Sequence, residues 1–190
     1  MQFFSEFLSL LDSRSFSSPW FWLVLFACWT LAGRGVLGVP NDVLSRAGRA
    51  LRESEAGLPA EAALLIDWLA LQLPRWRITR NGGALLTALV TFGVTALAVM
   101  GFGYDLEMAQ ALSLVAIPLA LLLALRLRLA HRLRWVLEAV SLGKPRREAA
   151  SEALRLINRY RALHMILSVL AVIVTTLWAS LWLLLHPNGL

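Results

Sequence analysis

The chain has 190 residues, of which 58% are hydrophobic and only 16% are charged, and its formal net charge is +6. A soluble domain carries about 25% charged residues, so this composition, with a mean hydropathy of +0.67, predicts a membrane protein. The basic residues lie between apolar runs that are long enough to cross a bilayer. We therefore expect the positive charge to set membrane topology, and we expect no nucleic acid partner.

Residues 1–18 precede the first apolar run and have an amphipathic pattern, which predicts an interfacial segment on the outer face of the membrane. The segment ends in a serine-rich corner that contains Asp12 and Arg14. Turns and helix caps use these residue types for hydrogen bonds, so we interpret the corner as structural. A ligand site at the same place is the alternative.

Four stretches have the length of about 17 to 25 apolar residues that a transmembrane helix needs. They predict spans over residues 19–39, 84–102, 108–125 and 163–185. Aromatic side chains with a polar edge lie at the ends of these stretches, as expected at the headgroup boundary. The sequence therefore predicts an all-α membrane protein with four transmembrane helices in a single integral membrane domain.

Residues 40–80 connect the first two spans and contain a shorter apolar stretch, Ala60–Leu73. Fourteen residues are too few for a span, and Glu61 and Asp67 would be costly in the bilayer core. The helical spacing of its apolar residues predicts an interfacial cytoplasmic helix that lies on the membrane or on the other helices.

A polar stripe follows the second predicted span, where Gly83, Thr87, Thr91 and Thr95 recur every four residues. Rows of small residues usually mark close helix packing, and threonines in membrane helices often bond to their own backbone. We interpret the stripe as a packing face. The lining of a hydrophilic path is the alternative.

Helix-forming sequence continues beyond the third span to about Leu142, is broken by Gly143 and Pro145, and resumes at Arg146 into the fourth span. The spacing predicts two helices of about 37 and 40 residues, which exceed the bilayer thickness. Residues 126–162 are therefore expected to form a protruding, antiparallel cytoplasmic hairpin. Its seam is predicted from residues at coiled-coil spacing, namely Leu129, Leu133, Val136 and Val140, and Ala150, Ala153, Ile157, Tyr160 and His164.

Arginines outside this seam are candidate contacts with anionic lipids or with an acidic partner. They are Arg126, Arg132, Arg134, Arg146, Arg147, Arg155 and Arg159. Residues 34–80 and 126–161 together hold 17 of the 18 lysines and arginines, so the positive-inside rule places both in the cytoplasm. This predicts a multi-pass protein of the bacterial inner (cytoplasmic) membrane with both termini in the periplasm.

The sequence contains no short motif of a zinc protease, a serine hydrolase, a nucleotide-binding loop or a redox dithiol. The single Cys28 can form neither an internal disulfide nor a thiolate metal site. An integral enzyme would need His164 at the same depth as Asp67 or Arg34. We therefore predict a non-enzymatic protein without catalytic residues, cofactors or bound metals.

Residues 12–22 (DSRSFSSPWFW), 38–42 (GVPND) and 101–111 (GFGYDLEMAQA) resemble a family of small inner-membrane proteins of purple-type alphaproteobacteria. The resemblance covers most of the chain through the third span. Members commonly carry the label "component of SufBCD complex", which implies a place in iron–sulfur cluster assembly. The family offers no catalytic residues to carry over. Cluster assembly needs thiolates, a nucleotide site or a docking surface for the soluble scaffold. This chain has a single cysteine and no nucleotide motif, so the resemblance implies only a docking role.

These observations favour an accessory or scaffold subunit of a larger inner-membrane assembly. It would dock through the basic cytoplasmic hairpin and the transmembrane surface. The expected partners are the lipid bilayer, in particular anionic lipids, and either other membrane subunits or further copies of the chain. The alternative function is a small homo-oligomeric channel or transporter lined by Thr87, Thr91 and Thr95.

Overall fold

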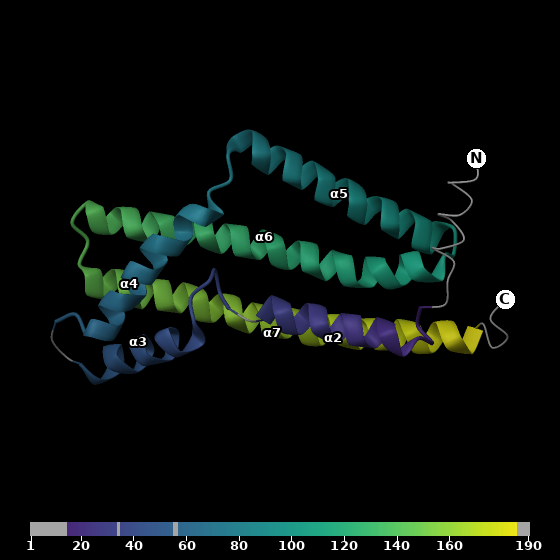
Figure 1. Ribbon diagram of the computed structural model, residues 1–190, viewed down its shortest axis with the longest axis horizontal. Coiled ribbons are helices and arrows are strands. Elements are labelled where there is room, and N and C mark those ends of the chain that lie inside the picture. Colours follow the sequence, from purple (N-terminus) through teal and green to yellow (C-terminus); the bar gives the residue numbers. More distant parts are fainter. Residues whose placement is uncertain (1–14, 34, 55–56, 186–190) are drawn as a thin grey trace. The chain divides into compact units, whose positions relative to one another are not determined.

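The computed structural model describes residues 15–33, 35–54 and 57–185. Within these ranges the chain is helical, apart from turns and an isolated bridge between Val36 and Val39. Figure 1 shows the helices, which are α2 (Pro19–Gly33), α3 (Asn41–Glu53), α4 (Ala60–Gln72), the 3-10 helix η1 (Leu73–Trp76), α5 (Arg80–Gly103), α6 (Glu107–Ser141) and α7 (Arg146–Leu185). Three of them, α5, α6 and α7, are long and apolar enough to cross a membrane.

The chain divides into two compact units. Unit 1 falls within residues 1–31, 79–122 and 166–190, and unit 2 within residues 32–78 and 123–165. Helices α6 and α7 contribute to both units. Unit 1 therefore contains most of the apolar sequence of the predicted spans, and unit 2 contains the two basic connections.

The helix of the first predicted span is shorter than expected. Helix α2 begins at Pro19, as predicted, but ends at Gly33 after 15 residues instead of continuing to residue 39. Leu37 and Gly38 have positive φ angles of 56° and 83°, which a right-handed helix cannot contain. The bridge between Val36 and Val39 then closes a turn ahead of Pro40. The structure thus corrects the predicted helix end by six residues.

The other long helices begin and end close to the predicted residues. Thr79 caps α5, because its side chain accepts a hydrogen bond from the backbone N–H of Gly82 at 3.2 Å. Helix α6 ends at Ser141, and Gly143 takes a φ angle of 102° in the turn that leads into α7. The glycine and the proline of this turn therefore break the helix as expected.

Unit 1 has an aromatic core. Phe16, Ala111 and Ala179 are buried there, and Trp22, Trp178 and two further aromatic side chains pack against them. Edge-to-face ring contacts join neighbouring elements, with centroid distances of 5.6 Å between Phe16 and Phe21 and 5.2 Å between Phe102 and Trp178. The core thus connects the segment before α2 with α6 and α7, while α5 joins it at its C-terminal end.

In unit 2, α3 and α4 pack against the adjoining ends of α6 and α7, and α4 crosses both of them (Figure 1). Ala62 and Ile66 of α4 form a core with Val136, Ala149 and Ala150. Helix α4 therefore lies on other helices, which is one of the two placements that the sequence allows. Most of the predicted seam is buried, whereas Val140 and His164 are only partly buried.

Candidate functional site

The seven arginines predicted as candidate contacts all lie in unit 2, but two of them face inward. The Nε of Arg126 donates to the Tyr160 hydroxyl at 2.8 Å, and its guanidinium also donates to the carbonyl oxygen of Ala32. Tyr160 precedes the predicted span at residues 163–185 and is 5% exposed. Burial raises the pKa of the Tyr160 phenol, and the hydrogen bond and charge of Arg126 oppose that rise. The phenol is therefore neutral at physiological pH and accepts from Arg126.

Arg147 is also a structural residue. Its guanidinium donates to the carbonyl oxygens of Gly57 at 2.8 Å and Leu51 at 3.3 Å, and to that of Ser54. These carbonyls lie at and just after the C-terminal end of α3, where a helix leaves its last acceptors unpaired and carries partial negative charge. Arg147 therefore anchors the end of α3 to the first turn of α7. Arg126 and Arg147, both predicted as candidate interaction residues, thus each have backbone carbonyl partners within unit 2.

The remaining predicted arginines form a more open surface. Arg134 is half-buried and contacts His131 Nδ1 at 3.2 Å. Arg132 and Arg159 line a shallow pocket of about 190 Å³ between α6 and α7, and Arg146 and Arg155 are exposed. The structure thus brings only Arg132 and Arg159 together in one depression.

A larger basic pocket lies between α3 and α7 and was missed in the sequence. Its volume is about 490 Å³, and its polar lining residues are Ser45, Arg49, Arg52, Glu53, Asn158 and Arg161. In the sequence analysis, the arginines of this pocket serve only to predict the membrane topology. The helical spacing of Val43, Leu44, Ala47 and Leu51 is the signal that could have identified α3 and hence the pocket.

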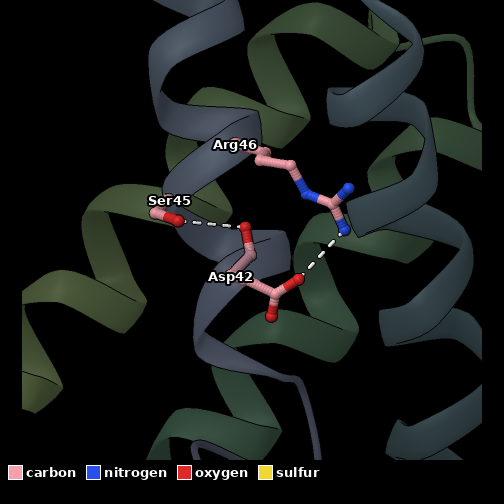
Figure 2. Close-up of polar contacts among 3 residues, drawn as sticks. All are labelled: Asp42, Ser45 and Arg46. Carbon is pink, nitrogen blue, oxygen red and sulfur yellow. Dashed lines mark hydrogen bonds and ion pairs between the residues drawn. The ribbon is translucent and has the colours of Figure 1, made fainter.

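Helix α3 carries a third arginine, Arg46, which is already paired. Figure 2 shows Arg46 at 3.0 Å from the Asp42 carboxylate, while the Ser45 hydroxyl donates to the Asp42 carbonyl at 3.0 Å. Arg49, Arg52 and Arg161 have no ion pair within the part of the chain that the structure describes. The positive charge of the pocket is thus uncompensated apart from Glu53, which also lines it.

The threonine stripe lies on the outside of unit 1. Thr87, Thr91 and Thr95 are all exposed on α5, and the Thr87 hydroxyl donates to the carbonyl oxygen of Gly83 at 2.9 Å. Leu85, Leu89 and Phe92 are exposed on the same helix. Within one copy of the chain the stripe therefore faces outward and does not enclose a path.

Two buried polar residues of α6 in unit 1 were also missed. Gln110 is 1% exposed, donates through Nε2 to the Gly101 carbonyl at 2.9 Å, and accepts from Trp178 Nε1 at 3.0 Å. Glu107 Oε1 accepts from the backbone N–H groups of Ser15 at 2.7 Å and Phe16 at 2.6 Å. These bonds satisfy buried backbone and side-chain groups, which is a structural task. The signal in the sequence is a pair of polar residues three apart where the third predicted span begins.

The other predicted positions do not form a reactive site. Asp12, Arg14 and Arg34 lie outside the described residues. His164 is half-buried with its ring 6.3 Å from that of Tyr160, and Asp67 is exposed on α4. In the described ranges, no group of three or more histidine, cysteine, aspartate or glutamate side chains is placed to hold a metal.

Comparison of the chain with protein-family models, curated proteins and solved structures finds no match. The described residues define the class as that of a helical protein, and three of their helices are long and apolar enough to cross a membrane. The resemblance to the alphaproteobacterial family stays a prediction from the residues that carry it.

Proposed function

We propose that the chain is a multi-pass protein of the bacterial inner membrane that crosses the bilayer four times, through α2, α5, α6 and α7. The length and apolar character of the last three support this topology. Helix α2 has 15 residues, or about 22 Å, against a hydrocarbon core of about 30 Å. The fourth crossing therefore uses the residues that flank α2 or a locally thinned bilayer.

In this topology the basic residues 34–80 and 126–162 lie in the cytoplasm, and both termini lie in the periplasm. The side of the N-terminus depends on whether α2 crosses. The test is labelling in spheroplasts with a maleimide that cannot pass the membrane. Cys28 is first replaced by alanine, and Ser17→Cys or Leu142→Cys is then introduced. We expect labelling of Ser17→Cys and protection of Leu142→Cys. Protection of both would show that α2 does not cross.

Within that membrane we propose the role of a non-enzymatic accessory or scaffold subunit of a larger assembly. The observation that carries this role is apolar exposure in the segment assigned to the cytoplasm. Trp135 is 61% exposed and Leu142 is 83% exposed, and in this topology neither is covered by the bilayer. Exposed tryptophans are typical of the centres of protein interfaces.

The surroundings of Trp135 indicate the chemistry of the partner surface. Trp135 and Arg132 line one pocket of about 340 Å³ between α6 and α7, together with Lys144. The charge of Lys144 is paired with Glu152. An aromatic side chain beside an arginine favours a partner that presents an apolar contact next to an acidic group.

The test is extraction of the native complex in mild detergent or native nanodiscs, followed by mass determination and identification of copurifying proteins. We expect a stoichiometric partner that is lost in Trp135→Ala. The matched control is Tyr104→Ala, because Tyr104 is 74% exposed but lies in the turn between α5 and α6, on the periplasmic side of the proposed topology. Recovery of the chain with lipid alone would contradict the role. A Suf scaffold protein as the partner would support the family resemblance.

A homo-oligomeric channel or transporter is the second candidate. It is favoured by the exposure of Thr87, Thr91 and Thr95 on α5, since copies that meet along this face would share a hydroxyl-lined path. The test is flux through purified protein in liposomes. Thr91→Val should reduce the flux, whereas Thr176→Val should not, because Thr176 is exposed on α7 and donates to its own backbone at Val172. Equal flux in both variants would contradict the channel.

A further inference from the structure

The basic pocket between α3 and α7 has the size and the donors of an anion site. Its volume of about 490 Å³ falls within the range of about 300–1,000 Å³ that is typical of small-molecule sites. Arginine side chains reach it from both helices, Arg49 and Arg52 from α3 and Arg161 from α7. We propose that this pocket binds the phosphate of an anionic phospholipid headgroup.

The donor set suits a phosphate group. A guanidinium presents paired N–H groups that match two phosphate oxygens, and it stays charged at every physiological pH. Arg49 and Arg52 are three residues apart on α3 and so share one face, which Arg161 and the Asn158 amide approach from α7. Glu53 is the only acidic residue among the lining side chains, so the described lining holds three arginines against one carboxylate.

The pocket arginines are available, in contrast to three other arginines of unit 2. Arg46 is held by Asp42 (Figure 2), and Arg126 and Arg147 donate to backbone carbonyls. No ion pair to Arg49 or Arg52 is present among the described residues. An external anion would therefore replace no internal partner.

The position of the pocket along the chain favours a lipid over a soluble phosphate. Arg161 lies two residues before the apolar run of residues 163–185, which places its guanidinium at the headgroup level of the proposed topology. Leu44 and Leu154 line the same pocket and offer apolar surface next to the arginines. The inference rests on the proposed membrane placement and not on the proposed subunit role, because lipid binding is measured on the chain without a partner.

The test is native mass spectrometry of the purified full-length chain in a non-ionic detergent, titrated with phosphatidylglycerol, phosphatidylcholine or inorganic phosphate. We expect preferential binding of one phosphatidylglycerol. The double variant Arg49→Gln/Arg52→Gln should weaken this binding at least about tenfold, since a basic residue near the membrane surface contributes about 1 kcal/mol. The control Arg46→Gln/Arg155→Gln removes the same charge from α3 and α7 outside the pocket, and it should change the affinity less than about twofold.

A second variant, Arg161→Gln, tests the pocket from the other helix and should also weaken binding if the α3 variant does not fold. Near-ultraviolet circular dichroism of the tryptophans reports the fold in each case. An equal loss in the pocket and control double variants would overturn the proposal, because it would indicate unspecific attraction. Arginine-dependent binding of inorganic phosphate without a preference for phosphatidylglycerol would overturn the lipid assignment.

Discussion

Gly101→Ala tests the closest approach between two helices of unit 1. A Cβ atom at residue 101 would lie 2.6 Å from the backbone nitrogen of Gln110 and 2.9 Å from the carbonyl carbon of Ala109. Separations below 3.0 Å are essentially never found for a real Cβ atom. Both neighbours are backbone atoms of α6 and cannot rotate away, so α5 and the start of α6 must separate.

The separation has two energetic consequences. Overpacking of a close contact costs about 1–3 kcal/mol. The separation of the helices also pulls the Gly101 carbonyl away from Gln110 Nε2, which lies 2.9 Å from it in the structure. The buried amide then lacks its acceptor, which costs about 1–3 kcal/mol. Alanine recovers about 0.5–1 kcal/mol of helix stability relative to glycine. We expect a net loss of about 1–5 kcal/mol in the free energy of unfolding.

The assay is thermal unfolding in detergent, followed by tryptophan fluorescence, because Trp178 donates to the same Gln110 side chain. A loss of this size lowers Tm by roughly 2–20 °C in a chain of this length. Gly93→Ala is the matched control on α5, since no heavy atom lies within 4 Å of its added Cβ, and its Tm should stay equal or rise. Equal melting of the two variants would refute the close approach of α5 and α6.

Three further variants test polar contacts between distant parts of the chain. Gln110→Leu leaves the Trp178 N–H and the Gly101 carbonyl without partners. We expect the free energy of unfolding to fall by about 1–3 kcal/mol and the Trp178 emission to shift, and an unchanged emission would contradict the contact. Glu107→Ala removes the acceptor of two backbone N–H groups, and chemical denaturation should show a loss of about 1–3 kcal/mol, with Glu107→Gln losing less. Arg147→Gln should speed hydrogen exchange at the C-terminal end of α3 by roughly tenfold, whereas exposed Arg155→Gln should not.

Local signals account for the parts of the fold that the sequence predicted. Proline at residue 19 and the Gly143–Pro145 turn mark helix boundaries through backbone geometry that depends on near neighbours only. The end of α2 was missed because the apolar run continues past Gly33 into Val36, Leu37 and Val39. Hydropathy does not distinguish these buried turn residues from a continuing helix, whereas their φ angles do.

The candidate sites depend on long-range contacts, which the sequence pattern does not show. Arg126 and Arg147 are bound by backbone carbonyls that are 90 or more residues away in the sequence. Nearly every residue has a backbone carbonyl that can accept such a bond. No residue type at any spacing therefore predicts which carbonyl an arginine will bind. Counting arginines therefore predicts how many charges a connection carries, but not which of them face a partner. The pocket between α3 and α7 was missed for the same reason, because its lining comes from two segments that are about 110 residues apart.

The stretch of residues 101–111 now has a physical explanation that bears on the family resemblance. Gly101 allows the close approach of α6, Gln110 joins three helices through its amide, and Glu107 holds the backbone at residues 15 and 16. These contacts depend on the polar side chains of Glu107 and Gln110 and on the lack of a side chain at Gly101, the features that make the stretch distinctive. A shared sequence here would therefore preserve helix packing, and it provides no thiolate or nucleotide contact of its own. A role in iron–sulfur cluster assembly must consequently be tested at the exposed surface of unit 2, where Trp135 and the unpaired arginines lie.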